Sequence, residues 1–143
     1  DAGVVWTHRD PQRTVPSYAS LSATNRRTLV GRAERRAAGP RITAGLAQGV
    51  ELALAARARL DPARFLDLPY AELVQDPQAA VGRVCAAFEH PCEAAHREAI
   101  ARWLRRHPAP RHRCPPEVFG VDPAEVARAF AGYRAWASER GLI

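Results

Sequence analysis

The stretch that decides the fold is Val4-Val5-Trp6-Thr7-His8-Arg9-Asp10-Pro11, near the start of a sequence of 143 residues. The β-branched and aromatic run at residues 4–7 is typical of a buried strand in a parallel sheet. Asp10 is a good helix N-cap and Pro11 fits the first helical position, so a helix is predicted over residues 11–21. Pro16 lies inside that helix and predicts a kink or a late start.

A second short strand is predicted at residues 65–68, and it ends at Pro69-Tyr70. Between the two strands, the sequence predicts an arginine-dense stretch (25–41) and then a long helix (42–60). Asp61-Pro62 is expected to end that helix. Apolar residues at helical spacing predict three more helices, which begin at Asp76-Pro77, near residue 96 and at Asp122-Pro123, the last bearing Val126, Phe130, Tyr133 and Ala137. Asp-Pro thus marks a start or stop at four positions.

Two short strands do not make an independent parallel sheet, and the sequence contains no Met. We therefore expect residues 1–143 to be the C-terminal part of a single domain whose first half lies upstream. The segment alone is expected to be marginally stable and inactive.

The charge of the chain is carried by arginine: 21 Arg and no Lys give a formal net charge of +6. This excludes lysine chemistry within these residues and implies an anionic partner. No run of residues approaches the length needed to span a bilayer, and no secretory signal is recognisable. Three cysteines cannot pair completely, so a cytoplasmic location is expected.

Arg9 and Ser17 are the residues best placed for chemistry. In open α/β sheets, ligands bind beyond the carboxyl ends of strands, where helix N-termini present free N–H groups. An Arg at a strand end supplies a charged fork, and a Ser within the next two helical turns supplies a neutral donor, so the two can hold one phosphate. The alternative is that Arg9 pairs with Asp10 or another carboxylate and that Ser17 is an ordinary helix residue.

This block resembles the 3′-phosphate-binding segment of the sulfotransferase family. These enzymes transfer a sulfuryl group from 3′-phosphoadenosine 5′-phosphosulfate (PAPS) to a hydroxyl or amine. In that family an Arg at a strand end and a Ser eight residues later hold the 3′-phosphate of the cofactor, and Arg9 and Ser17 have that separation.

Two later segments are similar to the same family. Residues 64–77 resemble its strand, Tyr-Glu-Asp-Leu and Asp-Pro block, in which the Tyr, here Tyr70, lies by the adenine; Ala71-Glu72 replaces Glu-Asp. Residues 103–122 resemble its C-terminal end, where a basic loop closes over the 3′-phosphate. That resemblance assigns cofactor binding to Arg111 and Arg113, although Cys114-Pro115-Pro116 departs from the expected Tyr-Ser-Leu.

The resemblance implies an α/β fold, namely a P-loop-like three-layer domain with a parallel sheet, of which this chain is the helix-rich C-terminal part. It implies PAPS as cofactor and a small-molecule or glycan acceptor, with neither a nucleic acid nor a membrane as partner. The phosphosulfate-binding loop and the catalytic base of the family normally precede the Arg-Ser block, so the catalytic residues are expected upstream. His8, beside Arg9, fits packing or a loop hydrogen bond better than catalysis.

Other interpretations start from different residues. A cluster of Cys85, His90, Cys92 and His96 invites a zinc site, but its spacing matches no common structural zinc pattern. The arginine-dense stretch, residues 25–41, favours a solvated or acceptor-side segment, with nucleic-acid binding as the alternative. The competing function is a non-enzymatic, basic helical module that binds an anionic partner. A strand followed by a Gly-containing basic loop upstream would favour the enzyme over this module.

Overall fold

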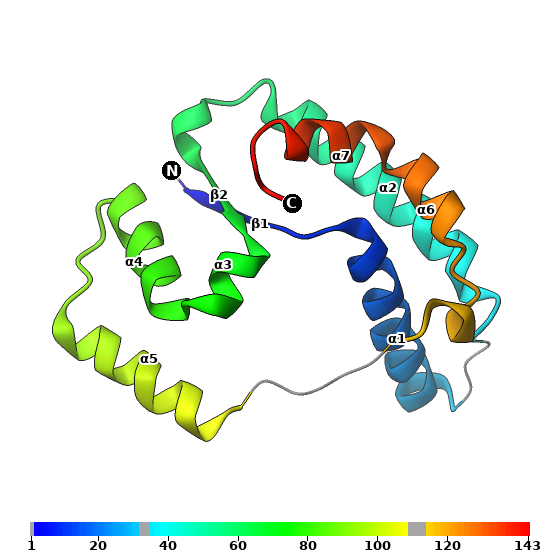
Figure 1. Ribbon diagram of the computed structural model, residues 1–143, viewed down its shortest axis with the longest axis horizontal. Coiled ribbons are helices and arrows are strands. Elements are labelled where there is room, and N and C mark those ends of the chain that lie inside the picture. Colours follow the sequence, from blue (N-terminus) through cyan, green and yellow to red (C-terminus); the bar gives the residue numbers. More distant parts are fainter. Residues whose placement is uncertain (1, 32–34, 109–113) are drawn as a thin grey trace. The chain divides into compact units, whose positions relative to one another are not determined.

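The computed structural model describes residues 2–31, 35–108 and 114–143, and Figure 1 shows the order of the elements. The described residues form two compact units. The first contains both strands of the described chain and the helices between Tyr70 and Arg106. The second contains two long helices and the helices that follow Pro116.

The first unit is built on two parallel strands. β1 (Val4–His8) pairs with β2 (Phe65–Pro69) in a register that sets Val4 opposite Phe65 and His8 opposite Pro69. The predicted parallel arrangement of these two strands is confirmed. The remaining elements of this unit are η1 (Pro62–Arg64), α3 (Tyr70–Gln75), α4 (Pro77–Ala87) and α5 (Ala94–Arg106). The short α3 was not predicted.

Burial along the strands differs from the prediction. Val4 and Val5 are 43% and 39% exposed, although a buried strand was expected there. The physical reason is that, within the described residues, each strand has one neighbour. Leu68 and His8 are buried, and His8 Nε2 lies 2.9 Å from Asp67 Oδ1, so a polar contact joins the two strands at their carboxyl ends.

The second unit is a helical assembly. It comprises α1 (Pro11–Val30), α2 (Ala38–Arg57), η2 (Pro116–Phe119), α6 (Pro123–Ala129) and α7 (Ala131–Ser138). The helices α1, α2 and α6 pack against one another, and α7 contacts α6. The predicted apolar stripe of the last helical segment is confirmed, because its four residues are all buried: Val126, Phe130, Tyr133 and Ala137.

Three helix boundaries in this unit differ from the predictions. α1 extends to Val30, not to residue 21, and it runs through Pro16 without a late start. Pro16 removes one helical hydrogen bond, but it is itself buried on the apolar face of the helix. α2 begins at Ala38 and ends at Arg57, so part of the arginine-dense stretch is helical at either end. The last helix is divided in two at Phe130.

All four Asp-Pro pairs begin a helical element in the same way. In each pair the Asp carboxylate accepts a backbone N–H of the turn that follows, at 2.9–3.0 Å: Asp10 from Gln12, Asp61 from Ala63, Asp76 from Ala79 and Asp122 from Ala124. The proline occupies the first helical position, where no N–H is needed. The pair at residues 61–62 therefore starts a 3₁₀ turn rather than only ending the helix before it.

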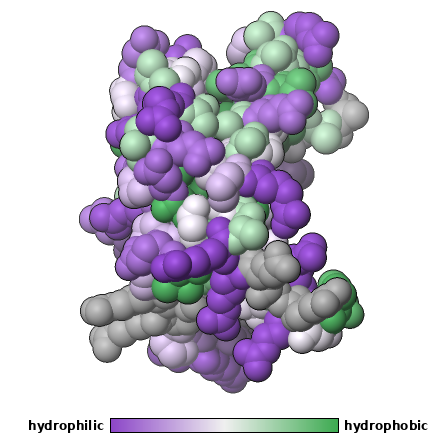
Figure 2. All heavy atoms as spheres, turned by 90° about the vertical axis from the view of Figure 1, so that its right-hand side faces the viewer, coloured by the Kyte–Doolittle hydropathy of each residue, from purple (hydrophilic) through white to green (hydrophobic). Residues whose placement is uncertain are grey.

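Hydrophilic residues cover much of the face shown in Figure 2.

Two arginines contact an aromatic side chain of the second unit: the guanidinium groups of Arg57 and Arg140 lie 5.3 and 4.6 Å from the ring centre of Trp136. No helix in the described part of the chain is both long enough and apolar enough to cross a membrane.

Candidate cofactor-binding site

Arg9 is positioned by the junction between β1 and α1. It follows the last residue of the strand directly and precedes Asp10, the N-cap of the helix. Its side chain is half-buried and makes contacts within the protein. The predicted position of Arg9, at the carboxyl end of a parallel strand, is therefore what the structure shows.

The N-terminus of α1 is closed by its own residues. Asp10 Oδ1 accepts the N–H of Gln12 at 3.0 Å, the carbonyl of Asp10 accepts those of Arg13 and Thr14 at 3.0 and 3.1 Å, and Pro11 has no N–H. The expectation of free N–H groups facing a ligand is therefore wrong for this helix. Asp10 also brings a negative charge to the end where an anion would gain from the helix dipole. Anion binding here must depend on side chains.

Ser17 lies in the second turn of α1 and is half-buried. It is about 9 Å along the helix axis from Pro11, at 1.5 Å per residue. Thr14, on the same helix, donates its hydroxyl to the carbonyl four residues before it, at 3.1 Å. No such bond is seen for Ser17 among the described residues. Its hydroxyl is thus available as a donor, in the same unit as Arg9.

The other predicted site residues are distributed differently. Tyr70 belongs to the first unit, where it begins α3 directly after β2 and is 38% exposed. Arg111 and Arg113 lie outside the described residues. The structure therefore brings Arg9 and Ser17 into one compact unit and places Tyr70 at the carboxyl end of the second strand.

His8 is packed and hydrogen-bonded. The residue is 1% exposed, its Nε2 lies 2.9 Å from Asp67 Oδ1, and its ring centre is 5.1 Å from that of Trp6. These contacts agree with the interpretation of His8 as a packed, hydrogen-bonded residue, and the location of the catalytic base upstream stays a prediction.

The Cys–His cluster serves structural contacts. Cys85 is half-buried. Its burial, a hydrogen bond with Cys92 and the charge of Cys92 all raise the pKa of its thiol. Zinc binds the thiolate form, which a raised pKa disfavours. His96 Nδ1 accepts the N–H of Glu93 at 3.2 Å as part of the capping of α5. Within residues 2–31, 35–108 and 114–143, no group of three or more His, Cys, Asp or Glu residues is arranged to hold a metal ion.

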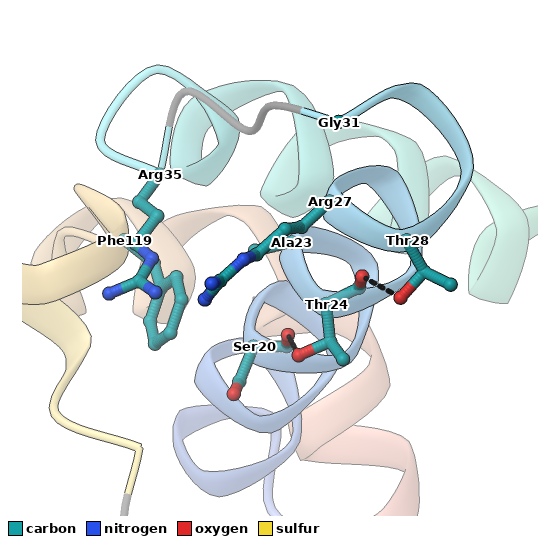
Figure 3. Close-up of a pocket in the computed structure, with 8 residues that line it drawn as sticks. All are labelled: Ser20, Ala23, Thr24, Arg27, Thr28, Gly31, Arg35 and Phe119. Atoms are coloured by element: carbon teal, nitrogen blue, oxygen red, sulfur yellow. Dashed lines mark hydrogen bonds between the residues drawn. The ribbon is translucent and has the colours of Figure 1, made fainter.

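A polar groove in the second unit was not found from the sequence. It has a volume of about 720 Å³ and is lined by Ser20, Ala23, Thr24, Arg27, Thr28, Gly31, Arg35 and Phe119. Figure 3 shows the guanidinium groups of Arg27 and Arg35 pointing into the same space, beside the ring of Phe119. The signal in the sequence was the arginine-dense stretch, but it did not show which of its arginines face one another.

Residues 1–94 match the family model described as the sulfotransferase family. The chain belongs to the sulfotransferase family. The matched range includes Arg9, Ser17 and Tyr70. It ends before Arg111 and Arg113, so those two positions depend on the resemblance in sequence alone.

The fold agrees with that assignment. The structure is similar to the crystal structure of sulfotransferase STF9 from Mycobacterium avium, with a TM-score of 0.78 and 23% identity over 92% of this chain. This chain spans 35% of the length of that protein. The prediction of a sulfotransferase-like α/β fold with a parallel sheet is confirmed. Among curated proteins, none matches the chain.

Proposed function

We propose that this sulfotransferase-family chain binds PAPS and takes part in the transfer of its sulfuryl group to a hydroxyl or amine of a small-molecule or glycan acceptor. The observation that carries the proposal is the pair Arg9 and Ser17, one at the carboxyl end of β1 and the other in the second turn of the helix that follows. Because Asp10 closes the backbone amides between them, these side chains are the donors for a 3′-phosphate.

The types of the residues fit the cofactor. The guanidinium of Arg9 can form two charged hydrogen bonds to a phosphate, and the hydroxyl of Ser17 adds a neutral one. Tyr70, from the family resemblance, would lie by the adenine, and Arg111 and Arg113 would close over the 3′-phosphate. When bound, PAPS would supply an activated sulfuryl group, whose bond to the 5′-phosphate breaks as a bond to the acceptor oxygen or nitrogen forms. The residues of this chain orient the cofactor and neutralise its charge.

The test is a comparison of two ligands by calorimetric titration. Adenosine 3′,5′-bisphosphate carries the 3′-phosphate and adenosine 5′-phosphate lacks it. Loss of a charged, bidentate partner costs about 2–3 kcal/mol, so Arg9→Ala should weaken the bisphosphate roughly 30- to 150-fold and leave the monophosphate nearly unchanged. Ser17→Ala should cost about 1 kcal/mol. Arg9→Lys should recover part of the loss, because an ammonium keeps the charge without the fork.

Arg13→Ala is the matched control. Arg13 is exposed on the first turn of the same helix, and its loss changes the net charge equally. It should leave both affinities nearly unchanged. Equal losses for both ligands in Arg9→Ala would mean that Arg9 supports the fold of the junction, and the assignment of the 3′-phosphate would then be wrong.

A further inference from the structure

The arginine end of the groove on the second unit lies away from the pair Arg9 and Ser17. Its lining begins at Ser20 and runs along α1 to Gly31, at the C-terminal end of the helix. Arg27 lies ten residues beyond Ser17, which is about 15 Å along the helix axis. A phosphate held by Ser17 therefore cannot also be bound by Arg27. An anion bound by Arg27 is therefore a different group from the phosphate held by Ser17.

Among the described residues that line the groove, all formal charge is positive. Arg27 and Arg35 point into the same space, and no carboxylate is among the described residues that line it. Two guanidinium groups that converge repel each other, and an oxyanion between them removes that repulsion and accepts their N–H groups. Arg27 alone could be explained by its place in the last turn of α1, where a cation is favoured by the helix dipole. That explanation does not account for Arg35, which approaches from outside the helix.

Along the helix, the groove presents hydrogen-bond acceptors. Thr24 Oγ1 donates to the carbonyl of Ser20 at 3.0 Å, and Thr28 Oγ1 donates to the carbonyl of Thr24 at 3.1 Å. Both hydroxyl protons are thus used within the helix, and the lone pairs of both oxygens can accept hydrogen bonds from a ligand. A ligand that fits this side carries hydroxyl groups. The floor of the groove is formed by two apolar residues, Ala23 and Phe119, which are 8% and 7% exposed.

We infer that this groove is a subsite for a hydroxylated, anionic acceptor: Arg27 and Arg35 hold an oxyanion of the acceptor, and Thr24 and Thr28 accept bonds from its hydroxyl groups. This inference rests on the proposed function and assigns a class of acceptor to it. A volume of about 720 Å³ lies within the usual range for small-ligand sites and accommodates a sugar ring with its anionic substituent. The chemistry required is an oxyanion a few bonds away from several hydroxyls, as in sugar phosphates and sugar sulfates.

The experiment uses D-glucose 6-phosphate as the probe and D-glucose as its neutral counterpart. Binding is followed by the amide signals of Thr28 and Gly31 in ¹⁵N-labelled protein, with and without saturating adenosine 3′,5′-bisphosphate. We expect glucose 6-phosphate to shift these signals equally in both conditions, since Arg27 lies about 15 Å along the helix axis from Ser17. Glucose should bind about tenfold more weakly or worse, because it lacks the charge.

Variants identify the residues responsible. Arg27→Gln should raise the dissociation constant for glucose 6-phosphate about tenfold or more, and Arg27→Lys should recover part of that loss. Arg26→Gln is the matched control, since Arg26 is the neighbouring residue of α1, is exposed and does not line the groove. It should change the dissociation constant less than about twofold, because Arg26 does not line the groove and acts on the ligand only through a charge screened by salt. Unchanged unfolding temperatures of these variants would show that the groove is intact.

Several results would overturn the inference. Equal losses in Arg26→Gln and Arg27→Gln would show a general effect of charge. Glucose binding as tightly as its phosphate would show that the arginines are not used. Displacement of the probe by adenosine 3′,5′-bisphosphate would assign the groove to the nucleotide. Failure of the proposed function is a different result, because Arg9→Ala tests the nucleotide site and should leave binding of glucose 6-phosphate unchanged.

Discussion

Replacing Gly39 by alanine tests a close backbone approach that supports the floor of the groove. Gly39 is the second residue of α2, and a Cβ built on it would lie 2.1 Å from the carbonyl oxygen of Gly120 and 2.7 Å from that of Phe119. The first distance is about 1.3 Å short of the 3.4 Å at which ordinary contact begins. Since the obstructing atoms belong to the backbone, the turn at Phe119-Gly120 must move as a whole.

The magnitude follows from two opposing terms. Overpacking of a closely packed contact costs about 1–3 kcal/mol, and a backbone obstacle places Gly39→Ala near the upper end. Alanine in place of glycine favours a helix by up to about 1 kcal/mol, and less so near the helix start. A net loss of about 2 kcal/mol is expected. For a chain of this length, that lowers the melting temperature by about 4–8 °C.

The assay is thermal unfolding followed by circular dichroism, and the same helix supplies the control. Gly45 and Gly49 are exposed residues of α2 around which a Cβ would meet nothing within 4 Å. Gly45→Ala and Gly49→Ala should each stabilise the protein by about 0.5–1 kcal/mol, so the sign is opposite to that of Gly39→Ala. A Gly39→Ala protein as stable as these controls would refute the reasoning. Because Phe119 lines the groove, Gly39→Ala should also weaken binding of glucose 6-phosphate.

Two further predictions concern the first unit. Asp67→Ala should lower the free energy of unfolding, measured in urea, by about 1–3 kcal/mol, because the buried ring of His8 loses its hydrogen bond to this carboxylate. The control is Glu72→Ala, which removes one partner of an exposed ion pair and should change that free energy by less than about 1 kcal/mol. Equal effects of the two variants would contradict the role given to Asp67. Cys92 raises the pKa of Cys85 by a hydrogen bond and by its charge. Cys92→Ala should therefore shift the pH midpoint for alkylation of Cys85 by iodoacetamide, followed by mass spectrometry, to lower pH. An unchanged or higher midpoint would show that Cys92 does not raise the pKa of Cys85.

The helix starts were predictable because their signal is local. In each of the four Asp-Pro pairs, the Asp carboxylate accepts a backbone N–H of the turn that follows. The proline has no N–H and occupies the first helical position, where none is needed. Neither interaction requires a residue from elsewhere in the chain. Helix ends were less predictable. α1 passes Leu21 and reaches Val30, where Gly31 adopts a left-handed conformation and donates its N–H to the carbonyl of Arg27. The spacing of buried apolar residues does not mark this end, because residues 24–30 are exposed.

The candidate site shows the same division. The place of Arg9 at a strand end and of Ser17 in the next helix follows from two neighbouring local signals, and the structure agrees with both. The closed N-terminus of α1 was missed, although Asp10 was recognised as a cap: a cap that satisfies the amides also removes them as ligands. The groove depends on Arg35 and Phe119 meeting α1 from separate parts of the chain, and no spacing rule predicts that.

The two anion sites proposed for α1 lie on one side of a single helix. Ser17, Ser20, Thr24, Arg27 and Thr28 fall within an arc of about 100°, and the helix is continuous from Pro11 to Val30. Their separation of about 15 Å is therefore set by the helix itself. Effects of mutations more than about 7–10 Å apart, with no shared partner, usually add to within about 0.5 kcal/mol.

Arg9→Ala and Arg27→Gln should thus act independently. The double variant should bind adenosine 3′,5′-bisphosphate as Arg9→Ala does and glucose 6-phosphate as Arg27→Gln does, with a coupling free energy below about 0.5 kcal/mol in titrations of each ligand. A ligand that bridged both sites would couple the two arginines, because loss of one contact would release the ligand from the other. A coupling well above 1 kcal/mol would therefore mean that one ligand spans the helix face, and that the nucleotide and the acceptor do not occupy the separate sites proposed for them.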